Sequence, residues 1–325
     1  MKKTLIALAV LAASGAAFAQ SSVTLSGVYS ASYQTDLTAA NANPVYAGST
    51  STGPTTAVLG AAKAKGFAVT DANVKLAAVE DLGGGLKASF DYTLETGAQR
   101  GSLTTRADSG IALSGGFGAV AFRNTRGSDL IASIGSAAIS LPDGLYDNLG
   151  IVSRGGIDTL SYTSPTVNGF TGSLTAVEAV DGNVDPTVWL ASNTAKAKSG
   201  TVFGLGYAAG PLAVSAAFKS NTLGSASTSK KNQTEIAVSY DLGVAKVAYA
   251  YDDKETTAAT AKAANGFSVT VPFGALTAGA NMFKRGDLKQ TEVGVSYAFS
   301  KRTALNVASG KLAGSATAAN NGTQN

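Results

Sequence analysis

The stretch EDLGGGLKASFDYTLE, residues 80–95, decides the fold class. After its glycine-rich turn, apolar or aromatic residues occupy every second position: Leu86, Ala88, Phe90, Tyr92 and Leu94. Polar residues fill the positions between them: Lys87, Ser89, Asp91, Thr93 and Glu95. Successive side chains of a β-strand point to opposite faces of the sheet. The pattern therefore predicts a strand over residues 86–95 with one apolar face and one hydrated face.

The N-terminus has the three parts of a secretory signal peptide. Lys2 and Lys3 precede an apolar run over residues 5–11, and the small-residue sequence Ala17-Phe18-Ala19 follows as a cleavage site. We expect residues 1–19 to be removed, which leaves residues 20–325 as one domain. Removal of Lys2 and Lys3 lowers the formal net charge from +4 to +2. Because the remaining charges are dispersed and of both signs, we expect no nucleic-acid partner.

The chain contains no cysteine and no histidine. An exported chain without cysteine cannot be a disulfide scaffold. Without histidine, Ser-His-Asp and Cys-His catalysis and the usual zinc sites are excluded. Mechanisms based on lysine or carboxylates survive in principle, but no motif supports one. We expect a protein that is not an enzyme and that uses no cofactor and no metal.

The alternation seen in residues 86–95 recurs along the mature chain. No stretch after the signal peptide is both continuously apolar and about 20 residues long, which argues against a helical membrane span. The chain has 38 glycines and only 14% charged residues, a balance that suits alternating strands between lipid and water. Fifteen strands are predicted, over residues 23–33, 73–80, 86–95, 105–114, 119–124, 157–163, 170–178, 201–208, 212–219, 234–240, 244–251, 266–271, 275–283, 289–297 and 303–309.

The connections between these strands alternate between short and long. Tight turns such as DLGGG, SGGFG and DLGV alternate with long polar loops such as residues 34–72, 180–200 and 252–265. Long loops on one rim and tight turns on the other are typical of an outer-membrane β-barrel. Aromatic residues near the strand ends predict two girdles at the membrane interfaces. The turn side has Tyr162, Phe170, Tyr207, Tyr240, Tyr297 and Phe299, and the loop side has Tyr33, Tyr92, Phe218, Tyr251 and Phe283.

Several of these segments carry a family resemblance. SSVTLSGVY, EDLGGGLKASF, LSGGFGAVAF, YTSPTVNGFTGSL, GPLAVSAAF and SKRTAL resemble segments of the general porins of beta-proteobacterial outer membranes, in order and at similar spacings. The resemblance implies an all-β, antiparallel, sixteen-stranded transmembrane β-barrel, usually a homotrimer. It also implies partners in the lipid bilayer and lipopolysaccharide of the outer membrane, and a water-filled lumen that passes small hydrophilic solutes and ions. The alternatives are a substrate-selective channel and a non-conducting structural barrel or adhesin.

The polar parity of each strand predicts the charges that line the lumen, because side chains cannot fill a barrel this wide. Six cations share this parity: Lys75, Lys87, Arg106, Arg123, Lys219 and Lys246. Five acids share it: Asp91, Glu95, Asp108, Glu235 and Glu292. We therefore expect a weak preference for anions, and the resemblance points the same way. Ala77 and Asp108 stand where the family commonly has basic residues, which indicates a less positive constriction than in its relatives.

Residues 125–153 break the alternation and contain scattered acids. In porins that resemble this chain, the loop at this place folds into the barrel and narrows it. The resemblance implies a transverse field between acids of this constriction loop and basic residues of the wall. The candidates are Asp129, Asp143 and Asp147 on the loop and Lys87, Arg106, Arg123, Arg126 and Arg154 on the wall. Asp143 could equally cap a turn, and Arg123 and Arg126 could be ordinary rim cations.

The predicted strand count is odd, whereas bacterial single-chain barrels normally have an even number. The tail SGKLAGSATAANNGTQN, residues 309–325, is polar, and it lacks the terminal aromatic residue of the family. We therefore expect the last strand to be missing, with an open seam between residues 23–33 and 303–309. Such a chain would insert poorly, because unpaired strand edges are costly in lipid.

Overall fold

The computed structural model describes residues 21–37, 64–95, 108–126, 130–134, 156–179, 199–222, 232–253, 263–286, 288–313 and 322–324. The sheet contains β1 (Ser22–Leu37), β2 (Ala64–Gly83), β3 (Leu86–Glu95), β4 (Ser109–Gly115), β5 (Gly118–Arg126), β6 (Gly156–Thr163), β7 (Phe170–Ala179), β8 (Ser199–Ala209), β9 (Leu212–Thr222), β10 (Asn232–Asp241), β11 (Lys246–Asp252), β12 (Ala264–Phe273), β13 (Leu276–Arg285), β14 (Leu288–Ala298), β15 (Ala304–Ala313) and β16 (Gly322–Gln324). Each of the fifteen predicted strands overlaps one of β1 to β15, and β3 has the predicted bounds.

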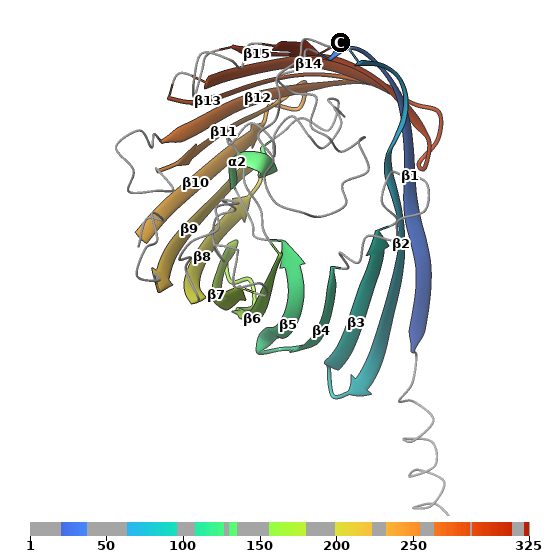
Figure 1. Cartoon of the computed structure of the whole chain (residues 1–325). Coiled ribbons are helices and arrows are strands. Elements are labelled where there is room, and N and C mark those ends of the chain that lie inside the picture. Colours follow the sequence, from blue (N-terminus) through green and yellow to red (C-terminus); the bar gives the residue numbers. More distant parts are fainter. Residues whose placement is uncertain are drawn as a thin grey trace, which may run out of the picture.

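The sheet is a single antiparallel meander in which each strand pairs with the next in sequence (Figure 1). Tight turns join β2 to β3, β4 to β5 and the later pairs up to β14 and β15. In the first of these turns, Gly83, Gly84 and Gly85 all have positive φ, between 61° and 82°. A side chain is strained at such φ values, so the three glycines of the opening motif are what this turn requires.

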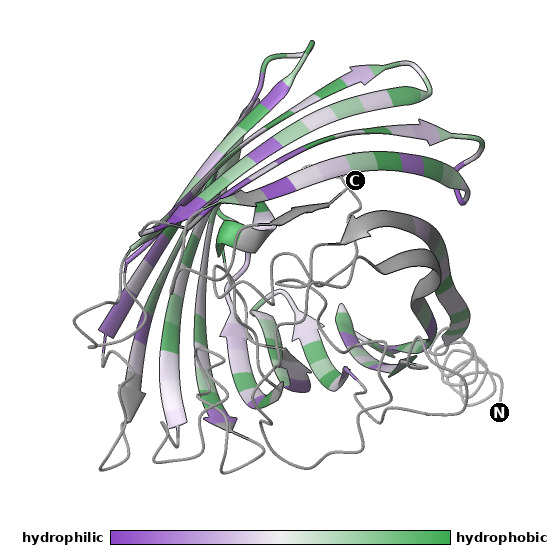
Figure 2. Cartoon of the chain, turned by 45° about the horizontal axis from the view of Figure 1, so that its top comes forward, coloured by the Kyte–Doolittle hydropathy of each residue, from purple (hydrophilic) through white to green (hydrophobic). Residues whose placement is uncertain are grey.

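Strand register separates an apolar face from a polar face. Leu76 pairs with Tyr92 and Ala78 pairs with Phe90, whereas Lys75 pairs with Thr93 on the opposite face. Figure 2 shows the resulting alternation of hydrophilic and hydrophobic bands along the strands. Large apolar side chains are exposed on nearly every strand, on the face turned away from the interior of the curl. A soluble protein rarely exposes such a continuous surface, whereas a membrane β-barrel turns it toward lipid.

The predicted open seam is present. Among the described residues, β1 pairs only with β2, and no pairing joins it to β15 or β16. Leu25 of β1 is 72% exposed, whereas Leu205 of the interior strand β8 is 46% exposed. The difference follows from the missing neighbour, since a second paired strand would cover part of each outward side chain.

The chain end differs from the prediction of an unpatterned tail. Gly322, Thr323 and Gln324 form the short strand β16, which pairs with residues 310–312 of β15. These backbone hydrogen bonds need no apolar alternation, so the side-chain pattern did not reveal them. β16 also lies close to β1, near the top of the view in Figure 1.

A short helix, α2 (Leu130–Ser133), lies inside the curl of the sheet against β9 to β12 (Figure 1). Ile131 and Ile134 are buried there against four alanines of the wall and Phe283: Ala237, Ala248, Ala250 and Ala264. α2, which follows β5 in the chain, therefore packs on the wall formed by β9 to β12. Within the described part of the chain, no helix is long and apolar enough to cross a membrane.

The prediction that Phe283 belongs to an aromatic girdle is wrong. Phe283 is fully buried on the inner face, beneath α2. It shares its parity on β13 with Asn281 and Arg285, and it lies opposite Gly266 of β12. The absence of a side chain at Gly266 leaves the space that the ring fills. Tyr92, Phe218 and Tyr251 of the same predicted girdle are exposed on the outer face.

Candidate functional site

Charged residues line the inner face in two regions, named here the β2–β5 wall and the β9–β14 wall. On the β2–β5 wall, Asp91 of β3 forms ion pairs with Arg123 at 3.0 Å and with Lys75 at 3.7 Å. The Arg123 side chain is 41% exposed and that of Asp91 is 15% exposed. Two cations therefore share one carboxylate, and both remain accessible to solvent.

Gly110 explains how Arg123 reaches Asp91 across an intervening strand. Gly110 of β4 lies between them in register, paired with Asp91 on one side and with Arg123 on the other. A Cβ atom at Gly110 would lie 2.6 Å from the Arg123 Cγ atom. The guanidinium passes over this bare backbone, so the glycine is part of the ion-pair geometry.

Lys87 extends the same positive surface toward the turn side. It is exposed on the inner face, opposite Asp81 of β2 and Ser114 of β4. No ion pair links Lys87 to any residue that the structure describes. Lys87 and Arg123 are thus the two predicted wall cations whose side chains can be placed.

The side chains of the other predicted site residues lie outside the described part of the chain. Arg126 is the last residue of β5, and its side chain lies outside the described residues. The remaining candidates also lie outside the described residues: Arg106, Arg154, Asp129, Asp143 and Asp147. Their roles stay predictions.

The β9–β14 wall holds a buried ion pair between Lys219 of β9 and Glu235 of β10, whose side chains are each 3% exposed. The second carboxylate oxygen of Glu235 accepts a hydrogen bond from the Leu130 amide at 3.3 Å. At the other end of α2, the Ser268 hydroxyl donates to the Ile134 carbonyl. The wall therefore holds α2 by a polar contact at each end and by apolar packing between the two contacts.

A second polar group lies further along this wall. Arg285 of β13 donates to Asp252 of β11 at 3.4 Å, and the Asp252 side chain is fully buried. Glu292 of β14 accepts hydrogen bonds from Asn281 at 3.2 Å and from Gln290 at 2.7 Å. Carboxylates this deeply buried are stabilised only when such donors satisfy them.

Sequence reasoning missed four members of this group: Asp252, Arg285, Asn281 and Gln290. Asp252 was assigned to a loop, although it continues the alternation of β11. Arg285 lay beyond the predicted end of its strand, after Phe283 and Lys284 interrupt the alternation of β13. Asn281 and Gln290 are uncharged and were not singled out. Extending the strand predicted over residues 244–251 by one residue would have found Asp252, whereas the side-chain pattern gave no signal for Arg285.

The register also adds to the predicted set of lumen charges. Asp81 pairs with Lys87, Asp241 pairs with Lys246, and Asp252 pairs with Glu235, so these acids belong to the inner parity together with Arg285. The count of charges therefore no longer favours cations. Three of the inner-face acids, Glu235, Asp252 and Glu292, are at most 2% exposed, and the cation Lys219 is 4% exposed. Lys75, Lys87 and Lys246, in contrast, are exposed.

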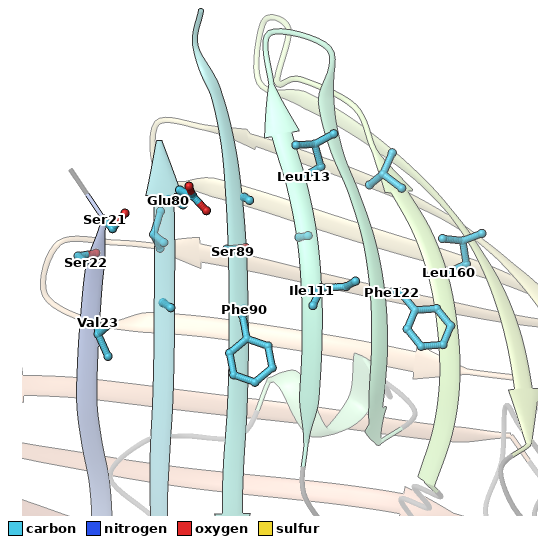
Figure 3. Close-up of a pocket in the computed structure, with 15 residues that line it drawn as sticks. Ser21, Ser22, Val23, Glu80, Ser89, Phe90, Ile111, Leu113, Phe122 and Leu160 are labelled. Atoms are coloured by element: carbon cyan, nitrogen blue, oxygen red, sulfur yellow. The ribbon is translucent and has the colours of Figure 1, made fainter. Parts of the chain in front are cut away.

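A hollow of about 630 Å³ lies on the opposite, apolar face of the sheet (Figure 3). Phe90, Ile111, Leu113, Phe122 and Leu160 surround it, near the turn-side ends of the first strands. Its lining is a continuation of the outer apolar surface. Among the described residues, no cluster of three or more acids, histidines or cysteines could hold a metal ion.

An antiparallel strand meander with an apolar outer face, a charged inner face and a segment folded inward defines a porin-type outer-membrane β-sheet. The family described as Gram-negative porin matches residues 4–317, and the chain belongs to this family. Membership places the protein in the outer membrane, and the family is one of channel proteins rather than enzymes.

Individual relatives agree with this assignment. Outer membrane porin protein 32 of Delftia acidovorans is 41% identical over 123 residues, which are 37% of this chain and 30% of that protein. The match thus spans less than a third of the curated relative. Two engineered variants of the porin of Rhodopseudomonas blastica have TM-scores of 0.59 and 0.57, each at 12% identity, over 93% of this chain and 97% of theirs. At that identity the likeness shows the fold alone.

Proposed function

We propose that the chain forms a water-filled channel through which small hydrophilic solutes and ions diffuse passively. The observation that carries this proposal is the pairing of an exposed apolar outer face with a charged inner face. We further propose a homotrimer set in the lipid bilayer and lipopolysaccharide of the outer membrane, because the family resemblance implies it.

Residues 125–153 are proposed as the constriction loop. Support comes from α2, which carries this segment onto the β9–β14 wall, across the interior from the β2–β5 wall. In this arrangement the acids Asp129, Asp143 and Asp147 would face the cations Lys87, Arg106, Arg123, Arg126 and Arg154. Opposed charges across a narrow pore create a transverse field that orients permeating solutes.

A weak preference for anions is part of the proposal. Lys75, Lys87, Arg123 and Lys246 face the lumen with substantial exposure, whereas several inner-face acids are buried in ion pairs or hydrogen bonds. Buried and compensated carboxylates contribute little to the potential that a hydrated ion meets in the lumen. The accessible net charge of the inner face is therefore more positive than the net charge obtained by counting all of its charged residues.

Reversal potentials in planar bilayers test both parts of this proposal. Purified protein reconstituted under a KCl gradient should give stepwise conductance and a reversal potential displaced modestly toward that of chloride. A reversal potential displaced clearly toward potassium would contradict the anion preference alone. If protein that has inserted into the bilayer gives no stepwise conductance, the channel function is contradicted.

A further inference from the structure

A second hollow, of about 250 Å³, lies on the inner face between α2 and the turn rim of β9 to β12. Ile134 closes its loop side, and small residues of the strands form its floor. Hydroxyl groups and one cation line it: Ser215, Ser239, Ser268, Thr270 and Lys246. Since a water molecule takes about 30 Å³ of liquid, the hollow has room for roughly eight waters or for one small organic ion.

Strand register brings these groups together around Lys246. Lys246 is the first residue of β11 and pairs directly with Thr270 of β12. Ala248 pairs with Ser239 of β10 on one side and with Ser268 of β12 on the other, so both serines are diagonal neighbours of Lys246. Diagonal neighbours on one face are about 7–8 Å apart, within reach of a lysine side chain.

Three donors of this hollow, Lys246, Ser215 and Ser239, are available to a ligand. Within the described residues, Lys246 forms no ion pair, and the hydroxyls of Ser215 and Ser239 make no hydrogen bond. Ser268 is already committed, because its hydroxyl donates to the Ile134 carbonyl. Asp241 pairs with Lys246 in register but is exposed at the rim, and one of its carboxylate oxygens accepts from the Gly243 amide.

We propose that this hollow is a binding subsite for small oxyanions, that is, inorganic phosphate or a small carboxylate. An ammonium group provides a charge-assisted hydrogen bond to an oxyanion, and neighbouring hydroxyls donate to its remaining oxygens. Chloride is a single, weaker acceptor, whereas an oxyanion presents separate oxygens to separate donors, so chloride gains less from the arrangement. The proposal rests on the channel function, because the hollow is reached through the lumen.

Its position assigns the subsite a role in permeation. Short turns lie on the periplasmic side of bacterial barrels, so the hollow lies between the inward-folded segment and the periplasmic exit. An oxyanion that has passed α2 meets Lys246 before it leaves the lumen. Transient binding at this point lowers the flow of other ions while the site is occupied.

Block of the KCl current tests the proposal. We expect inorganic phosphate or succinate, added in separate experiments at constant ionic strength and pH, to lower the conductance of the native channel saturably. Lys246→Gln should raise the half-blocking concentration about fivefold, because a charge-assisted contact is lost at an exposed site. Ser239→Ala should raise it about twofold. A response to one anion only would identify which oxyanion the subsite accepts.

Lys301→Gln is the matched control, because Lys301 lies exposed in the turn between β14 and β15, on the same rim but outside the hollow. It should change the half-blocking concentration by less than a factor of two. Three results would disprove the subsite. The native channel could conduct without saturable block, Lys246→Gln could have the same half-blocking concentration as the native channel, or Lys301→Gln could raise that concentration as much as Lys246→Gln does. A protein that does not conduct at all overturns the channel function, and the subsite with it.

Discussion

The two charged walls use the same chemistry in different surroundings. On the β9–β14 wall, Lys219 and Glu235 are buried under α2, and Glu235 also accepts the Leu130 amide. On the β2–β5 wall, Arg123 and Asp91 form an ion pair in contact with solvent. Burial makes the first pair a structural anchor, whose disruption leaves an uncompensated charge. Because the second pair is exposed, it contributes to the electrostatic potential in the lumen but little to the free energy of unfolding.

The largest expected effect comes from Lys219→Met. This substitution leaves the Glu235 carboxylate buried without its cation, which costs about 3–5 kcal/mol of unfolding free energy. Urea unfolding in lipid vesicles, followed by tryptophan fluorescence, measures the loss. The double variant Lys219→Met with Glu235→Leu should recover most of it, because no buried charge remains. A single variant as stable as the native protein would show that Glu235 is not confined by α2.

Gly266→Ala should have the next largest effect, through the packing of α2. An added Cβ would lie 2.5 Å from Phe283 Cδ1 and 3.1 Å from Ile134 Cδ1, so the ring or the helix must shift. Overpacking of this kind costs about 1–3 kcal/mol. Gly206→Ala is the matched control, since a Cβ there meets only a carbonyl oxygen at 3.8 Å. Equal unfolding midpoints for the two variants would contradict the close packing of Ile134 and Phe283 against Gly266.

Arg123→Gln on the exposed wall should separate stability from selectivity. Asp91 keeps its contact with Lys75, and the exposed pair that is lost is worth about 0.2–1 kcal/mol. The reversal potential under a KCl gradient should nevertheless move toward that of potassium, because one accessible positive charge is removed. A loss of stability as large as that of Lys219→Met would erase the distinction between the walls.

Lys87→Gln should have the smallest effect on stability. Lys87 is exposed and has no ion pair with the described residues, so the unfolding free energy should change by no more than about 0.5 kcal/mol. The reversal potential should move in the same direction as for Arg123→Gln. If it moves toward chloride instead, the accessible charge of the β2–β5 wall does not set the selectivity.

Local pattern predicted the strands because the side-chain period of a strand belongs to the strand itself. Alternation and turn residues predicted fifteen strands and the division into two faces. The open seam was predicted from the odd strand count and from the tail, which lacks the terminal aromatic of the family, and the short strand β16 was missed. The error at Phe283 arose where residue type was given more weight than parity. Thr277 and Asn281 share the parity of Phe283, and this signal already favoured the inner face.

The sequence by itself determined the strand meander, its two faces and its family, because each depends on residues close together along the chain. Only the tertiary structure decided which inner-face charges are buried. Leu130 contacts Glu235, and Ser268 contacts Ile134, across more than 100 residues of chain. The period of a strand carries no information about which wall an inward-folded segment will cover. Burial by that segment makes one ion pair an anchor and leaves the other facing the lumen.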